Sequence, residues 1–148
     1  TEVATTQGVE FNLSHSGDFA LIAVTRGRKV GVDVELIREG IELENLSSRN
    51  FSQMENQELM ALPVEQRTLG FFACWTRKEA YIKAQGLGLS LPLDSFDVSL
   101  GESAVLRATR PDASESARWS LHSLNVESNY AAALAVEGND FESRCWVW

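Results

Sequence analysis

Residues 29–35 read Lys-Val-Gly-Val-Asp-Val-Glu, and the alternation in this segment points to a strand with two different faces. Side chains alternate between the faces of a strand, so the three valines share one face and must lie in a core. Gly31, Asp33 and Glu35 share the other face. Two carboxylates at this spacing repel each other unless a cation lies between them, and Mg²⁺ commonly binds one or two carboxylates together with substrate phosphates. The segment therefore predicts a Mg²⁺ site, with Gly31 leaving room for a ligand. An exposed acidic strand face is the alternative.

A long helix is predicted over residues 64–85, since it would follow Pro63 and end before Gly86. Glu79 and Lys83 lie four residues apart on it, in the order that favours a surface ion pair. The apolar residues around Glu79 follow helical spacing, so this carboxylate lies at the edge of an apolar stripe. It could complete a metal site or act as a base. An ordinary ion pair at the margin of the core is the alternative.

A short polar segment at residues 11–18 precedes the first apolar strand and contains Asn12, Ser14, His15 and Ser16. Small hydroxyl donors, a histidine and a glycine suit a loop that cradles a phosphate. A Ser/His/Asp nucleophilic triad is not favoured, because neighbouring residues of one loop do not reach that geometry. A polar turn is the alternative.

The remaining pattern is typical of an α+β domain with antiparallel pairing. Strands at 19–25 and 29–35 are expected to form a hairpin. A Ser-x-x-Glu capping box at 52–55 predicts a short helix that ends near residue 62. Further strands are predicted at residues 96–100, 104–108, 119–126, 130–136 and 145–148, with a polar loop at 110–117.

Bulk properties fit one domain over residues 1–148. The net charge of −8 disfavours nucleic-acid and anionic-membrane binding, and no apolar run approaches the about 20 residues of a membrane helix. Two basic clusters, at 26–29 and at 77–83, are expected to be solvated faces, with a local anion site as the alternative.

Cys74 lies among apolar residues and is expected to be a buried thiol, and its distance in sequence from Cys145 gives no zinc-binding pattern. A reducing, cytoplasmic location is expected.

Three segments in a fixed order resemble the 4′-phosphopantetheinyl transferase superfamily, in the subclass that activates peptide and polyketide synthetases. They are Phe-Asn-Leu-Ser-His-Ser at 11–16, Val-Gly-Val-Asp-Val-Glu at 30–35 and Trp-Thr-Arg-Lys-Glu-Ala-Tyr-Ile-Lys at 75–83. The resemblance implies a fold in which an antiparallel sheet packs against a long helix. It also implies an enzyme that transfers the phosphopantetheine arm of coenzyme A (CoA) to a serine of an acyl or peptidyl carrier protein and releases adenosine 3′,5′-bisphosphate. Such enzymes serve fatty acid, polyketide and nonribosomal peptide biosynthesis.

By this resemblance, Asp33, Glu35 and Glu79 are the Mg²⁺ ligands. Glu79 is the expected base, and Lys83 is expected to offset charge on the transferred phosphate. Asp33, Glu79 and Lys83 are therefore the catalytic candidates.

The CoA-binding candidates are Ser14 and His15 at the nucleotide-phosphate end, together with Lys83 and Gly31. In the subclass, a related half-domain precedes the Ser-His-Ser segment and packs against the second half with CoA between them. Only ten residues precede Phe11, so the chain is expected to be the C-terminal-type half, paired with a missing half or a second chain. By the resemblance, residues 36–51 are expected to border the carrier-protein docking surface, and a solvated loop that folds its apolar residues inward is the alternative.

Two other functions remain open from the residues alone. One is a non-catalytic module that binds CoA or a carrier protein. The other is a different Mg²⁺-dependent phosphate enzyme, such as a hydrolase, which would not require the Ser-His-Ser segment.

Overall fold

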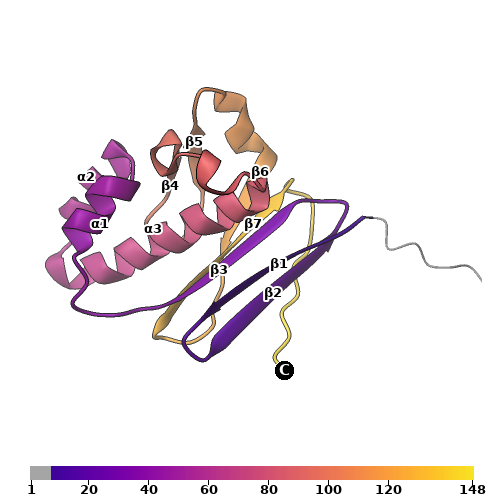
Figure 1. The fold of residues 1–148 in the computed structure, drawn as a ribbon, viewed down its shortest axis with the longest axis horizontal. Coiled ribbons are helices and arrows are strands. Elements are labelled where there is room, and N and C mark those ends of the chain that lie inside the picture. Colours follow the sequence, from indigo (N-terminus) through magenta and orange to yellow (C-terminus); the bar gives the residue numbers. More distant parts are fainter. Residues whose placement is uncertain (1–7) are drawn as a thin grey trace, which may run out of the picture.

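The computed structural model describes residues 8–148, which form an α+β fold (Figure 1). In chain order, the elements are β1 (Val9–Ser16), β2 (Phe19–Arg26), β3 (Val30–Leu36), α1 (Leu43–Asn50), α2 (Gln53–Ala61), α3 (Val64–Gln85), the 3₁₀ helices η1 (Gly88–Ser90) and η2 (Leu93–Ser95), β4 (Phe96–Val98), β5 (Leu106–Thr109), the 3₁₀ helix η3 (Ala113–Arg118), β6 (Trp119–Ser123) and β7 (Tyr130–Glu137). The central sheet has the order β3–β7–β6, and both of its pairings are antiparallel. The predicted fold class is therefore confirmed.

The predicted hairpin between residues 19–25 and 29–35 is wrong. β2 pairs with β1 along its whole length, while β3 pairs with β7. Gly17 has a φ of +55°, which glycine adopts readily, and it closes a tight turn that sets Ser16 opposite Phe19. Residues 11–16 of the polar segment are accordingly a strand rather than a loop, and residues 17–18 form the turn.

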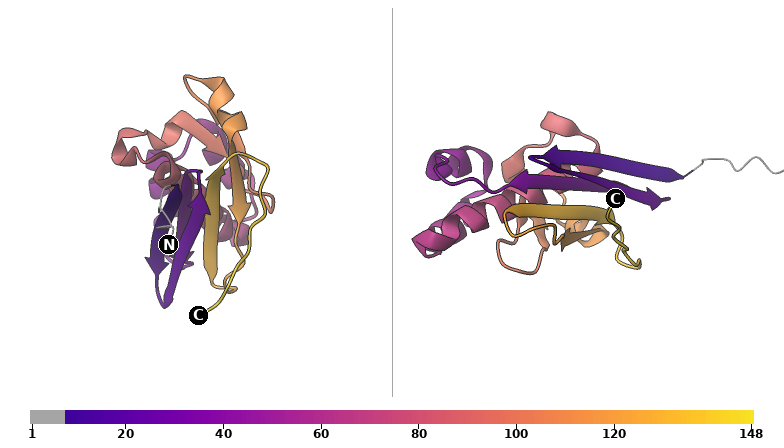
Figure 2. Two further views of the ribbon diagram at one scale, coloured as in Figure 1. Left: turned by 90° about the vertical axis from the view of Figure 1, so that its right-hand side faces the viewer. Right: turned by 90° about the horizontal axis from the view of Figure 1, so that it is seen from below.

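The long helix α3 has the predicted bounds and lies across the face of the central sheet (Figures 1 and 2). Gly86 ends it in a left-handed conformation, with a φ of +70°. The shorter α2 opens with the predicted capping box, in which the Ser52 hydroxyl accepts from the Glu55 N–H and the Glu55 carboxylate accepts from the Ser52 N–H. Local sequence signals thus predicted these two helices.

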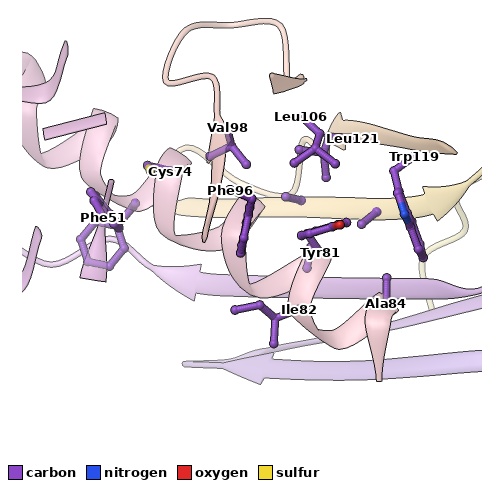
Figure 3. Packing of buried hydrophobic residues seen from close by; sticks show 14 of the residues in the cluster. Phe51, Cys74, Tyr81, Ile82, Ala84, Phe96, Val98, Leu106, Trp119 and Leu121 are labelled. Atoms are coloured by element: carbon purple, nitrogen blue, oxygen red, sulfur yellow. The ribbon is translucent and has the colours of Figure 1, made fainter. Parts of the chain in front are cut away.

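The apolar core lies between α3 and the strands that it covers (Figure 3). Tyr81 is central to it, with its ring edge-on to Phe96 at 4.7 Å and to Trp119 at 5.5 Å between centroids. Aromatic pairs in this arrangement contribute about 0.5–1.5 kcal/mol beyond the burial of their surface. This packing fixes the rotation of α3 about its own axis, and so determines which of its residues face β3.

The basic residues at 77–83 do not form a shared face, solvated or anion-binding. Arg77 is buried and donates to the carbonyls of Ser99 and Gly101, each at 2.6 Å. Lys78 is fully buried, with Nζ 2.8 Å from the Glu55 carboxylate and 2.7 Å from the Phe96 carbonyl. Burial in an apolar core requires that a lysine be paired in this way. These two side chains therefore hold α3 to its surroundings.

Other sequence expectations have mixed outcomes. The strands predicted at 96–100, 104–108, 119–126 and 130–136 are present as β4 to β7 with altered ends. Residues 145–148 form no strand, and helix α1 lies in the segment 36–51.

Cys74 is buried as expected, and both it and Cys145 are free thiols. Among the described residues, no helix is long and apolar enough to cross a membrane.

Candidate active site

β3 presents Asp33 and Glu35 on the face that meets α3. The valines of the other face, Val30, Val32 and Val34, are buried as the alternation predicts. Asp33 is also buried, at 4% exposure, while Glu35 is half-buried. A carboxylate this far from water needs compensating partners, and α3 and β1 provide them.

Asp33 is held by one residue of α3 and one residue of β1. Lys83 on α3 lies with Nζ 2.9 Å from Asp33 Oδ1, and Ser14 on β1 donates to the same oxygen at 3.1 Å. Lys83 also donates to the Val32 carbonyl at 3.1 Å. The other oxygen, Asp33 Oδ2, is buried and has no hydrogen-bond partner among the described residues. Such an orphaned acceptor indicates a missing positive or donor group.

Glu79 lies one helical turn before Lys83 and is half-buried. The ordinary ion pair between them, which is the alternative to a site role, is not formed, because Lys83 contacts Asp33 instead. Within residues 8–148, the Glu79 carboxylate has no hydrogen bond or ion pair, whereas Asp33 and Glu35 are close enough to influence its ionisation.

The pKa of each of the three carboxyls is raised. Burial is the largest cause in every case. The charge of Asp33 further raises the pKa of Glu35 and of Glu79, and Lys83 opposes the rise. The charge of Asp33 thus disfavours ionisation of the other two carboxyls, and a nearby cation would offset this repulsion.

The sequence predicts that Asp33, Glu35 and Glu79 meet at one point, and this geometry is not present. Within the described part of the chain, no three His, Cys, Asp or Glu side chains are spaced to share a metal ion. Lys83 supplies the positive charge beside Asp33 Oδ1. The residues present nevertheless suit a hard divalent cation, since Asp33 Oδ2 has no partner among residues 8–148 and carboxylate oxygens are the groups that such ions bind.

Gly31 does not leave room for a ligand, so this prediction is wrong. A Cβ at this position would lie 2.0 Å from the Ala80 carbonyl oxygen and 2.4 Å from the Ala84 nitrogen. The space is filled by the backbone of α3, and the missing side chain allows the helix to touch the strand. Gly31 thereby brings Glu79 and Lys83 close to Asp33.

Ser14 and His15 lie on opposite faces of β1, as successive residues of a strand must. The Ser14 side chain is buried against β3, and His15 is exposed. The structure therefore does not bring these two CoA-binding candidates together on one surface.

Two residues on the same face of β1 as Ser14 make equivalent contacts with β3. Asn12 and Ser16, like Ser14, accept hydrogen bonds from backbone N–H groups along the open edge of β3. These bonds, which we call the side-chain ladder, are Val32 N–H to Asn12 Oδ1 (2.9 Å), Val34 N–H to Ser14 Oγ (3.1 Å) and Leu36 N–H to Ser16 Oγ (2.9 Å). The polar residues at 12, 14 and 16 recur with the period of a strand, and this signal could have identified them.

Residues 29–135 match the family model described as the 4′-phosphopantetheinyl transferase superfamily. The chain belongs to this superfamily. The matched region spans β3, α3 and β6 and most of β7, and so contains Asp33, Glu35, Glu79 and Lys83 on the elements that build the candidate site.

Curated relatives of the superfamily align with most of the chain. The 4′-phosphopantetheinyl transferase HetI of Nostoc sp. is 39% identical over 139 residues, which cover 94% of this chain and 56% of that protein. The 4′-phosphopantetheinyl transferase Sfp of Bacillus subtilis is 36% identical over 131 residues, covering 88% and 56%. The chain thus spans about half the length of the curated relatives that it matches.

Solved structures share the superfamily fold. The holo-[acyl-carrier-protein] synthase of Thermotoga maritima has a TM-score of 0.55 at 21% identity, over 74% of this chain and 62% of that one. The complex of ACPS with CoA from Chronobacterium ammoniagenes has a TM-score of 0.52 at 20% identity, over 76% and 98%. These likenesses establish the fold.

Proposed function

We propose that this chain provides the catalytic half of an enzyme that transfers the 4′-phosphopantetheine arm of CoA to a serine of an apo-carrier protein, releasing adenosine 3′,5′-bisphosphate. The observation that carries the proposal is the cluster of Asp33, Glu79 and Lys83, in which one buried oxygen, Asp33 Oδ2, has no hydrogen-bond partner in the part of the chain that the structure describes. Membership of the superfamily and the CoA complex of a structural neighbour support the same substrate.

Asp33, Glu35 and Glu79 would hold Mg²⁺. When bound, the ion would neutralise charge on the CoA pyrophosphate and stabilise the leaving group. Phosphoryl transfer requires positioning and charge neutralisation more than covalent participation by the protein. Glu79 is the base in this proposal, because its carboxylate makes no hydrogen bond to other described residues and burial raises its pKa.

Lys83 would offset charge on the transferred phosphate. Its Nζ carries three donors, and the described contacts engage Asp33 Oδ1 and the Val32 carbonyl. The side chain is about one-third exposed, at 29%, so the ammonium group remains open to a ligand at the surface. His15, exposed on β1, is retained as a contact for the nucleotide phosphates.

A second half, or a second chain, would cover the outer face of the β1–β2 hairpin. This face carries large apolar residues that are largely exposed, with Phe11 at 72%, Ile22 at 68% and Val24 at 65%. Phe11 and Val24 are directly paired, so they form one continuous apolar surface. Exposed apolar patches of this kind mark interaction sites. The half-length match to the curated relatives supports the same proposal.

The deciding experiment is the intact mass of an apo-carrier protein after incubation with CoA, Mg²⁺ and this chain. The chain is tested alone and as part of a protein that contains both halves. A mass gain of one phosphopantetheine on the carrier supports the proposal. CoA binding without any mass gain in the two-half protein would instead support the non-catalytic binding module.

A further inference from the structure

Ser14 makes a second hydrogen bond in addition to its bond in the side-chain ladder. Asn12 contacts the β3 backbone at Val32 N–H, whereas Ser14 both accepts from Val34 N–H and donates to Asp33 Oδ1, each at 3.1 Å. A serine hydroxyl has a single hydrogen, and the backbone N–H already occupies one of its lone pairs. The hydrogen is therefore held in the direction of Asp33.

This hydrogen bond restrains the Asp33 carboxylate from one side. Oδ1 receives both Ser14 and Lys83, and the buried Oδ2 is left without a described partner. Lys83 reaches Asp33 through a long flexible side chain, while Ser14 is short, buried and fixed to the edge of β3. Ser14 is thus the more rigid of the two restraints.

We propose that Ser14 is a positioning residue that orients Asp33 so that Oδ2 is the oxygen offered to a divalent cation. This inference rests on the proposed function, which requires a cation at this carboxylate. It gives Ser14 a role different from that of a CoA contact. Residues that orient metal ligands typically change metal affinity by about 10–100-fold when they are replaced.

The test is a Mn²⁺ titration of the full chain, with free Mn²⁺ measured by electron paramagnetic resonance, in the absence and in the presence of CoA. Ser14→Ala removes the hydroxyl, and Ser14→Thr restores one. Asn12→Ala is the matched control, because it removes a ladder bond of similar length that does not reach Asp33. Thermal unfolding of each variant, without metal, reports whether the hairpin remains docked.

Ser14→Ala is expected to weaken Mn²⁺ binding about tenfold or more. Asn12→Ala and Ser14→Thr should stay within about twofold of the parent chain. In a two-half protein that transfers the arm, Ser14→Ala should raise the Mg²⁺ concentration for half-maximal rate and leave the rate at saturating Mg²⁺ nearly unchanged.

Equal Mn²⁺ affinity in Ser14→Ala and the parent would overturn the inference, as would an equal loss in Asn12→Ala. A parent chain without a saturable Mn²⁺ site would also overturn it. Absence of transfer by the two-half protein, with the expected order of Mn²⁺ affinities, would instead contradict the proposed function and leave the role of Ser14 supported.

Discussion

Lys83 Nζ lies 2.9 Å from Asp33 Oδ1, which joins the long helix to the acidic strand across 50 residues of sequence. The contact is possible because Gly31 allows the backbone of α3 to approach β3. Lys83 therefore opposes the rise that burial causes in the pKa of Asp33, and the charge of Asp33 in turn raises the pKa of Glu79.

Glu79→Gln is expected to lower the transfer rate by about 10²–10⁴-fold, while CoA affinity falls much less. Glutamine keeps the size of the side chain and one acceptor oxygen, but a neutral amide is a poor base. Rate and CoA affinity are measured side by side in a two-half protein, with Asp33→Asn as the comparison. Near-normal turnover of Glu79→Gln would show that Glu79 is neither the base nor an essential ligand.

The same substitution is expected to stabilise the metal-free chain near neutral pH. Burial and Asp33 raise the pKa of Glu79, so the folded chain binds the Glu79 proton more tightly than the unfolded chain does. The protonated side chain therefore stabilises the fold at low pH, and this stabilisation is lost as the pH rises through the folded-state pKa. Glu79→Gln should therefore raise the melting temperature at about pH 7, with the gain shrinking toward about pH 4. Glu102→Gln, in an exposed loop, is the control for loss of a charge alone. A constant difference at both pH values would contradict this linkage.

Gly31→Ala is expected to destabilise the chain by about 1–3 kcal/mol or more. The added methyl group would lie 2.0 Å from the Ala80 carbonyl oxygen, so α3 must move away from β3. Urea unfolding measures the loss. Gly101→Ala is the matched control, since nothing lies within 4 Å of its added Cβ. Similar free energies of unfolding for the two variants would mean that α3 and β3 are not in close contact.

Lys78→Met is expected to lower the free energy of unfolding by about 3–5 kcal/mol, because it leaves the buried Glu55 carboxylate without its cation. The double variant with Glu55→Gln should lose less free energy of unfolding than the two single variants lose together. For comparison, the exposed pair of Arg107 and Glu58 should contribute only about 0–1 kcal/mol in the same double-mutant cycle. Additive effects at Lys78 and Glu55 would contradict a coupled buried pair.

Leu46→Glu is expected to weaken carrier-protein binding and to leave CoA binding nearly unchanged. Leu46 is an exposed apolar residue of α1, in the segment 36–51 that the resemblance to the superfamily predicts to border the docking surface. Calorimetric titration with an apo-carrier protein and with CoA separates the two effects. Val105→Glu, at an exposed position between β4 and β5, controls for added charge. An equal loss of both ligands would count against a docking role.

The sequence alone determined the features that depend on neighbouring residues. The bounds of α3 and the capping box at Ser52 follow from local geometry, and each is present in the structure. β3 is a strand as its sequence predicts, although residues 30–34 are buried on both of its faces. The order of the three motifs also identified the superfamily, which the family model confirms.

Only the tertiary structure decided which partners each residue meets. β3 and β7 lie far apart in the chain, so the sequence could not show that they pair. The burial of Lys78 and the contact of Gly31 with α3 likewise depend on how the helix is rotated and placed. Whether a polar side chain binds a ligand or holds another residue depends on these distances, and for this reason Ser14 could be placed beside Asp33 only once the fold was known.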